Sequence, residues 1–362
     1  MSVTRIPIRK KIALKLYQKR KQNAAKLHEL KYIMWECTLR CNLNCLHCGS
    51  DCTKDAAHPD MPARDFLTAL DQVTPLVNPN DTMIVLTGGE VLLRNDLENI
   101  GINLYKRGFP WGIVTNGMLL TRPKLKALLN SGLRALTISF DGFEESHNRL
   151  RGNKKSYIRA FEAIKALSST KGLIYDVVTC VNQKNIDELE QLKNLLIQHG
   201  VKAWRMFTIF PIGRARKHVE LQLTPKQFRS LFEFIKTTRR EGKIDLSYGC
   251  EGFLGNYEAE VRDAFFHCQA GIHVASVLVD GSISACPNLR ANFIQGNIYK
   301  DNFAEVWQHR YQKFRDRSWT KTGLCAACEF YKYCEGNGMH LRDEQTGELL
   351  FCHLHRLQES EN

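Results

Sequence analysis

The sequence predicts an α/β protein built on a parallel sheet or an open barrel, followed by a smaller cysteine-rich unit. Short β-type runs alternate with helical patterns six times between residues 31 and 208, the alternation stops near residue 248, and clustered cysteines follow. The chain has 362 residues, 43% hydrophobic and 25% charged. No apolar run approaches the roughly 20 residues that span a bilayer. We therefore expect a large soluble protein with two or three domains.

The first 30 residues form a basic arm. They hold nine Lys and Arg side chains against one acid, Glu29, in a chain of net charge +13. The only early apolar run, residues 12–14, is cut by Lys15 and is too short for a secretory signal, so a cytoplasmic protein is expected. A solvated amphipathic helix is the simplest interpretation of the arm; a contact for an acidic peptide, lipid headgroups or nucleic acid is the alternative.

The strands and helices of the repeats follow from periodicity. Six mostly apolar runs are the expected strands, at 31–36, 83–87, 112–115, 135–140, 175–181 and 203–208. Helical spacing predicts helices over 63–76, 97–106, 123–131, 157–167, 186–199 and 225–240. Later, strands at 277–278 and 282–285 flank Asp280-Gly281 as a hairpin. The predicted units are the arm (1–30), the β/α unit (31–215), a connecting helical segment (216–247) and the cysteine-rich unit (248–362).

Three cysteines follow the first strand at the spacing C-x3-C-x2-C: Cys41, Cys45 and Cys48. Three thiolates on one loop can hold three irons of a [4Fe-4S] cluster and leave the fourth iron open to a small molecule. Zinc is the alternative, although zinc sites prefer two C-x2-C pairs. Cys37 and Cys52 lie outside this spacing and are expected to be packing residues or free thiols.

Further candidates lie where the strands end. Gly88 and Gly89 allow the backbone to approach a ligand closely, and Glu90 can accept a hydrogen bond from an ammonium group. Small polar side chains suit ribose hydroxyls, and a guanidinium suits a carboxylate. The remaining candidates at strand ends are Asn116, Ser139, Asp141 and Arg151, with Asn182 and Arg205 as candidates for a cavity wall.

These motifs, in this order, resemble the radical S-adenosylmethionine (radical SAM) enzymes over about residues 31–215. The resemblance implies a partial (β/α)6 TIM-like barrel, a [4Fe-4S] cluster on the three cysteines, and S-adenosylmethionine bound at the open iron. It places His47 near the adenine, where the family usually has an aromatic side chain. Val91 replaces the proline of the family's Gly-Gly-Glu-Pro motif. The roles implied are cofactor binding for His47, Gly88, Gly89, Glu90, Asn116, Ser139 and Arg151, and a substrate-side position for Asp141.

The later cysteines resemble the SPASM extension, which carries auxiliary iron–sulfur clusters. The resemblance implies a complete outer cluster on Cys325, Cys328, Cys334 and Cys352, with zinc as the alternative. An inner cluster would use Cys268, Cys286 and Cys250, but Gly338 stands where a further cysteine is expected. The inner site could thus be a cluster with a non-cysteine or open position, a [2Fe-2S] centre, or empty. Cys180 lies in a predicted strand and is expected to be a core residue.

The resemblance implies reductive cleavage of S-adenosylmethionine to a 5′-deoxyadenosyl radical, which removes hydrogen from the substrate. The SPASM resemblance favours a peptide or small protein substrate, encoded nearby, and a flavodoxin or ferredoxin as reductant, with no DNA partner. A small molecule or a tetrapyrrole is the alternative substrate. A basic zinc protein that binds nucleic acid would explain the net charge but not Gly88-Gly89-Glu90, and an electron carrier would not need a cofactor-sized barrel.

Overall fold

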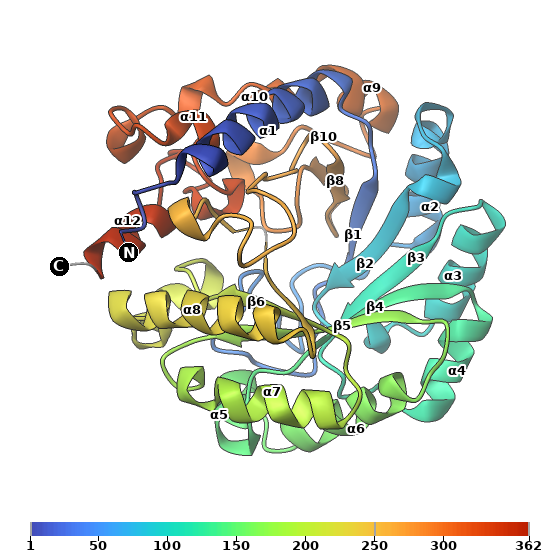
Figure 1. Ribbon diagram of the computed structural model, residues 1–362. Helices are drawn as coiled ribbons and strands as arrows, with labels where there is room; N and C mark the ends of the chain where they lie inside the picture. Colours follow the sequence, from blue (N-terminus) through green and yellow to red (C-terminus); the bar gives the residue numbers. More distant parts are fainter. Residues whose placement is uncertain (1, 250, 361–362) are drawn as a thin grey trace.

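The computed structural model describes residues 2–249 and 251–360, and their strands form one ten-stranded sheet in the order β10-β9-β8-β1-β2-β3-β4-β5-β6-β7 (Figure 1). All neighbours from β8 through β1 to β7 are parallel, whereas β9 pairs antiparallel with β8 and with β10. The strands are β1 (Tyr32–Thr38), β2 (Met83–Gly88), β3 (Trp111–Thr115), β4 (Leu133–Ser139), β5 (Ile174–Val181), β6 (Ala203–Thr208), β7 (Asp245–Tyr248), β8 (Val274–Val277), β9 (Ser282–Ser284) and β10 (Gly296–Asn297).

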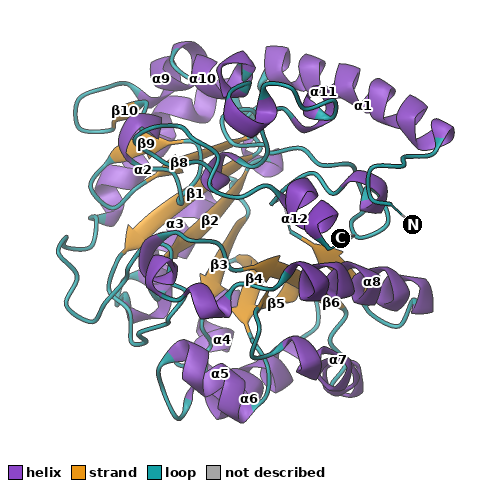
Figure 2. Cartoon of the chain, turned by 90° about the vertical axis from the view of Figure 1, so that its left-hand side faces the viewer, coloured by secondary structure: helices purple, strands orange, loops and turns teal. Residues whose placement is uncertain are grey.

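Helices cover the outer face of the curved sheet, which confirms the predicted partial barrel (Figures 1 and 2). The helices of this layer are α2 (Ala63–Val73), α3 (Leu97–Lys106), α4 (Arg122–Asn130), α5 (Glu144–Arg151), α6 (Ser156–Ser168), α7 (Leu189–Gln198) and α8 (Pro225–Glu241). The start of α8 shows why the predicted bounds were accurate: Thr224 and Gln227 form a capping box and Pro225 occupies the first turn. Helix α5 was not predicted as an element.

The two faces of the sheet differ in burial. On the outer face, Trp35 stacks on Phe66 of α2 with ring centroids 4.1 Å apart, and both side chains are buried. On the inner face, Asp176 and Arg205 form an ion pair of 2.8 Å and remain partly exposed. A closed TIM barrel fills its interior with side chains. The open sheet therefore keeps an accessible inner face, which is where a cofactor and a substrate can lie.

The cysteine-rich unit is joined to the barrel through the sheet. β8 pairs in parallel with β1 over four residue pairs, from Tyr32 with Val274 to Trp35 with Val277. The predicted hairpin is confirmed, since β8 and β9 pair antiparallel across the turn that contains Gly281, whose φ is +84°. The strands before and after residue 248 thus belong to one sheet. The predicted domain boundaries remain a prediction. The remaining helices of this part are α9 (Phe303–His309), α10 (Gln312–Arg315), α11 (Tyr331–Cys334) and α12 (His353–Glu359).

The basic arm is a helix, α1 (Ile8–Leu27), as predicted. Contrary to the prediction, it is only partly exposed to solvent. Lys21 is buried against α11, where its Nζ donates to the Tyr333 carbonyl at 2.8 Å and pairs with Glu335 at 2.9 Å. One face of the arm therefore packs on the cysteine-rich part, while Ile8 and Ile12 on another face are more than half exposed.

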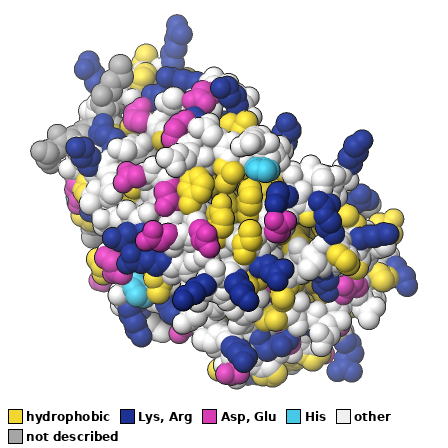
Figure 3. All heavy atoms as spheres, turned by 90° about the horizontal axis from the view of Figure 1, so that it is seen from below, with side chains coloured by type: hydrophobic (Ala, Val, Ile, Leu, Met, Phe, Trp, Pro, Cys, Tyr) yellow, Lys and Arg dark blue, Asp and Glu magenta, His cyan; other side chains and the backbone are white. Residues whose placement is uncertain are grey.

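The positive charge is distributed unevenly between two sides of the molecule. α1 holds eight Lys and Arg residues and no acid. On the face seen from below, away from α1, Lys and Arg side chains are interspersed with Asp and Glu (Figure 3). Across residues 2–249 and 251–360, no helix has both the length and the apolar character needed to cross a membrane.

Candidate cluster and cofactor site

The loop that carries Cys41, Cys45 and Cys48 follows β1, and all three thiols are free of disulfides. Two contacts fix this loop against later parts of the barrel. The Leu46 amide donates to the Leu150 carbonyl of α5 at 2.9 Å, and the Arg214 side chain donates to the Cys45 carbonyl at 2.8 Å. Three soft donors on one rigid loop fit the cluster that the spacing predicts.

The thiols differ in acidity. Burial raises the pKa of Cys41 to about 11. Hydrogen bonds from Cys52, led by its side chain, lower the pKa of Cys48 despite burial; the Cys52 amide lies 3.4 Å from the Cys48 sulfur. Since metals bind the thiolate, iron binding at Cys41 must release a proton. Cys52, expected to be a packing residue or a free thiol, therefore supports a predicted cluster ligand.

Gly88 and Gly89 lie against the chain that enters the cysteine loop. A Cβ added at Gly88 would stand 2.0 Å from the Thr38 carbonyl oxygen, and one at Gly89 would stand 2.1 Å from that of Arg40. The Gly89 amide donates to the Thr38 carbonyl at 2.8 Å. The two glycines are therefore required by the protein's own close packing, a reason that differs from the predicted approach to a ligand. Their contact with the cofactor remains a prediction.

Glu90 is fully buried and holds the end of β3. Its carboxylate accepts hydrogen bonds from Thr115 Oγ1 at 2.7 Å, the Asn116 amide at 2.8 Å and the Leu92 amide at 3.1 Å, while burial raises its pKa. Asn116 Nδ2 in turn donates to Asn42 at 2.8 Å and lies 3.9 Å from the Cys41 sulfur. Glu90 thus positions Asn116 at the cysteine loop, and the predicted contacts of both with the cofactor remain predictions.

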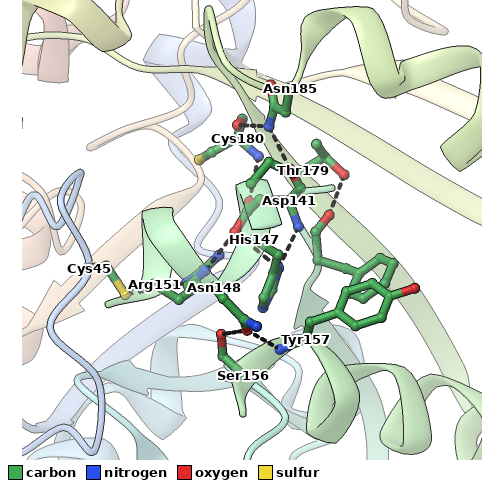
Figure 4. A network of polar contacts seen from close by, with 12 residues as sticks. Cys45, Asp141, His147, Asn148, Arg151, Ser156, Tyr157, Thr179, Cys180 and Asn185 are labelled. Atoms are coloured by element: carbon green, nitrogen blue, oxygen red, sulfur yellow. Dashed lines mark hydrogen bonds and ion pairs between the residues drawn. The ribbon is translucent and has the colours of Figure 1, made fainter. Parts of the chain in front are cut away.

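Arg151 of α5 lies between a buried carboxylate and a cluster cysteine (Figure 4). Its Nε donates to Asp141 at 2.6 Å, and its Nη1 donates to the Cys45 sulfur at 3.8 Å. Burial opposes the ionisation of Asp141, but the Arg151 guanidinium, together with His47 and His147, more than offsets burial and lowers the pKa of that carboxyl. Asp141 also accepts the Cys180 amide at 2.9 Å. Asp141 therefore orients Arg151, and its predicted substrate-side position remains a prediction.

Two histidines flank this pair. His147 Nδ1 accepts the Asp141 amide at 2.9 Å, and burial lowers the pKa of His147 to about 4 (Figure 4). A donor atom of His47 lies within 4.8 Å of both the Asp141 carboxylate and the Cys180 sulfur. Its Nδ1 is buried without a hydrogen-bond partner among the residues described. Burial keeps His47 neutral by lowering its pKa to about 3, and its predicted position near the adenine remains a prediction.

Cys180 and Asn182 have roles that the sequence did not show. Cys180 was expected to be a core residue, but it lies on the inner face and lines a cavity. Asn182 is buried and stabilises a turn through the Cys180 carbonyl and the Lys184 amide, so it does not form the predicted cavity wall. Arg205 lies on the inner face beside Asp176, and its place in a cavity wall remains a prediction. Ser139 ends β4 and is partly exposed there.

Two adjoining cavities lie beside the cysteine loop. The first, about 260 Å³, is lined by His47, Cys180, Phe207, Phe210 and Glu251 among others, and we call it the aromatic cavity. The second, about 230 Å³, is lined by residues that include Arg216, Arg290 and Arg342, and we call it the arginine cavity. Gly49, Ile212 and Asn288 line both. The two cavities therefore adjoin each other. The sequence did not predict the three arginines as a group, because they lie far apart along the chain.

The four cysteines of the predicted outer cluster are free thiols in the C-terminal turns. Cys334 interacts electrostatically with Cys352 and Cys325, and burial raises its pKa above the usual range of a thiol. Arg342 Nη2 donates to the Cys325 sulfur at 3.7 Å and its Nε to the Gly336 carbonyl at 3.0 Å. The donor set fits an iron–sulfur cluster, with a guanidinium beside one ligand.

The inner set is less complete. At Gly338, an added Cβ would stand 2.5 Å from the Glu251 carbonyl oxygen and 2.9 Å from the His340 ring, so a cysteine there requires a shift of the backbone. Cys268 is buried, and Arg317 lowers its pKa against the effect of burial. Cys286 is partly exposed, and Cys250 lies outside the described residues. The inner cluster remains a prediction.

An open α/β barrel with three free thiols on one loop, and an arginine held beside one of them, defines an iron–sulfur enzyme with room for a cofactor on its inner face. A model of the radical SAM superfamily matches residues 35–196, and a model of the SPASM iron–sulfur cluster-binding domain matches residues 268–329. The chain therefore carries a radical SAM domain followed by a SPASM domain. These two domains imply S-adenosylmethionine and [4Fe-4S] clusters as the cofactors.

Among curated proteins, the chain is 27% identical to an AdoMet-dependent heme synthase of Methanosarcina barkeri over 328 residues, covering 84% of this chain and 90% of that protein. It is 24% identical to an Fe-coproporphyrin III synthase of the same organism over 332 residues, covering 84% and 82%. It is 26% identical to the mycofactocin maturase MftC of Mycolicibacterium smegmatis over 319 residues, covering 85% and 77%.

Solved structures show the same fold. One is anSMEcpe with bound AdoMet and the Cp18Cys peptide, with a TM-score of 0.71, 18% identity, and coverage of 91% of this chain and 95% of that one. Another is Streptococcus suis SuiB bound to S-adenosylmethionine, with a TM-score of 0.68, 18% identity, and coverage of 86% and 73%. At this identity the likeness concerns the fold alone.

Proposed function

We propose that this radical SAM enzyme acts on a tetrapyrrole that carries carboxylate side chains. The observation that carries the proposal is the similarity to an AdoMet-dependent heme synthase over 84% of the chain. Two further relatives are named for tetrapyrroles: the Fe-coproporphyrin III synthase, and a pre-heme d1 synthase of Dinoroseobacter shibae that is 22% identical over 342 residues. The relatives thus favour the tetrapyrrole alternative over the peptide that the sequence favoured.

The cavities beside the cysteine loop support this choice. A tetrapyrrole has a flat apolar ring and, at its edge, carboxylates. The aromatic cavity supplies Phe207 and Phe210, and the adjoining arginine cavity supplies the guanidinium groups of Arg216 and Arg290. Ligand sites commonly combine apolar walls with a few placed polar groups, and guanidinium groups pair well with carboxylates.

The chain's own residues would orient the reactants. When bound, the cluster and S-adenosylmethionine supply a 5′-deoxyadenosyl radical that removes hydrogen from an unreactive C–H bond. Arg151, held by Asp141 beside Cys45, would pair with the methionyl carboxylate. Asn116, held by Glu90, would fix the position of the cysteine loop through its hydrogen bond to Asn42. The barrel's task is to exclude water and to hold one substrate carbon in line.

The test is an anaerobic assay of the reconstituted enzyme with S-adenosylmethionine, dithionite and a panel of iron tetrapyrroles that includes Fe-coproporphyrin III. We expect 5′-deoxyadenosine in step with a mass change of one tetrapyrrole, followed by liquid chromatography and mass spectrometry. The variant with alanine at Cys41, Cys45 and Cys48 is the control and should give neither product. Cleavage of S-adenosylmethionine with every tetrapyrrole unchanged would contradict the proposal.

A peptide substrate is the second candidate. It is supported by the similarity to MftC and to the subtilosin biosynthesis protein AlbA of Bacillus subtilis, which is 25% identical over 308 residues and covers 83% of this chain. Co-expression with a peptide encoded nearby, followed by mass spectrometry of that peptide, distinguishes the two. A mass change of the peptide together with unchanged tetrapyrroles favours the second candidate.

A further inference from the structure

Arg290 joins the cysteine-rich part to the barrel at the edge of the arginine cavity. It follows β9 and donates from Nη2 to Glu36 Oε1 of β1. Glu36 is fully buried, and its other oxygen accepts the Val279 amide at 3.3 Å. A buried carboxylate that receives one guanidinium and one amide fixes the direction of that guanidinium. Arg290 is therefore held in place from behind.

The rest of the Arg290 guanidinium is available to a ligand. A guanidinium has five N–H donors, and within the described part of the chain Glu36 is the one acceptor recorded for Arg290. The side chain is 32% exposed and lines the arginine cavity. Arg342 lines the same cavity, but its donors are used by the carbonyls of Gly336 and Gly347 and by the Cys325 sulfur. Arg290, unlike Arg342, has capacity for a further acceptor.

Arg216 lines the same cavity from the loop after β6. Its Nη2 lies 3.6 Å from Asp343, a loose ion pair, and its side chain is 53% exposed. A carboxylate ligand that enters this cavity therefore meets one fixed and one adaptable guanidinium. Because the arginine and aromatic cavities share Gly49 and Ile212, a ligand anchored there extends toward His47 and Cys180 beside the cysteine loop.

We propose that Arg290, with Arg216, binds a carboxylate side chain of the substrate in the arginine cavity, and that Glu36 is the positioning residue for Arg290. This assignment rests on the proposed function, because it places a tetrapyrrole with its ring in the aromatic cavity and one carboxylate between the two arginines. It adds residues that determine specificity: a tetrapyrrole with free carboxylates is bound more tightly than its ester.

The test is a fluorescence titration of the reconstituted enzyme with coproporphyrin III and with its tetramethyl ester, which differs only in the blocked carboxylates. We expect the wild type to bind the acid more tightly than the ester. Arg290→Gln should weaken binding of the acid by about 10- to 100-fold, because a charge-assisted hydrogen bond is lost, and should leave binding of the ester unchanged. Arg216→Gln and Glu36→Gln should have smaller effects in the same direction.

Arg107→Gln is the matched control, because Arg107 forms a similar ion pair with Asp71 at 2.8 Å away from both cavities. Equal affinity of Arg290→Gln and the wild type for the acid would overturn the assignment of Arg290 and leave the proposed function standing. A wild type that binds neither porphyrin and modifies no tetrapyrrole overturns both.

Arg290→Gln leaves the Glu36 carboxylate buried without its partner, which destabilises the folded protein. The double variant Glu36→Gln/Arg290→Gln removes both charges and keeps the shape of the pair, so it serves as the second measurement. Circular dichroism confirms that it is folded. A folded double variant that has lost the preference for the acid over the ester supports the proposal, and one that keeps the wild-type preference overturns it.

Discussion

The two cysteine-bearing regions are built in different ways. Around the first loop, side chains from distant elements converge: Asn116 follows β3, Arg151 belongs to α5, and Arg214 reaches from the loop after β6. Around the outer set, the contacts are local, as with Arg342 on Cys325 and Asn337 beside Cys334. The first site therefore depends on the barrel as a whole, whereas the second depends mainly on turns near its own cysteines, with α1 packed against α11 through Lys21.

The largest expected difference is between one cysteine variant in each region. Cys45→Ala should abolish cleavage of S-adenosylmethionine, because the cluster that binds the cofactor loses a ligand. Cys328→Ala should keep that cleavage and lose formation of product, since it affects a site away from the cofactor. Counting iron and 5′-deoxyadenosine in both proteins checks this. Loss of cleavage in Cys328→Ala would show that the two regions do not act separately.

A smaller effect is expected for the pair that orients the cofactor. Asp141→Asn removes the charge that holds Arg151, so we expect a decrease of about 10- to 100-fold in the efficiency of S-adenosylmethionine cleavage. Iron content should be unchanged, because Asp141 touches no cluster cysteine through its side chain. Asp176→Asn is the control, since it disrupts a similar pair with Arg205 deeper on the inner face. Equal losses in both variants would contradict a specific role of Asp141.

Sequence reasoning reached the parts of this site that depend on local pattern. The spacing of Cys41, Cys45 and Cys48 and the strand runs are local signals, and the six strands were found within two residues at each end. The pairing of β8 with β1 and the contact of Glu36 with Arg290 were not predictable, because they join residues more than 240 positions apart. The contact of Asp141 with Arg151 was not predicted for the same kind of reason: it depends on how α5 packs.

Gly338 provides a test of the second region. Gly338→Cys restores the cysteine that the SPASM pattern expects, but its Cβ would crowd the Glu251 carbonyl oxygen at 2.5 Å. We expect a loss of roughly 1–3 kcal/mol in the free energy of unfolding and no gain of iron. Denaturant unfolding and iron analysis measure both. A gain of about four irons without loss of stability would mean that the inner site was built to hold a full cluster.

A further prediction concerns acid stability in the first region. Burial holds the pKa of His147 at about 4, well below its ordinary value of 6.5. Between these two values the unfolded chain binds a proton that the folded protein does not, so stability falls as the pH decreases from 6.5 toward 4, by up to about 1.4 kcal/mol per pH unit for one group. His147→Gln should reduce this slope in anaerobic denaturant unfolding at several pH values. His355→Gln, on an exposed residue of α12, should leave the slope unchanged. If His147→Gln does not alter the slope, other groups cause the loss of stability in acid. The Asp141–Arg151 pair would then stabilise the first region without a contribution from neutral His147.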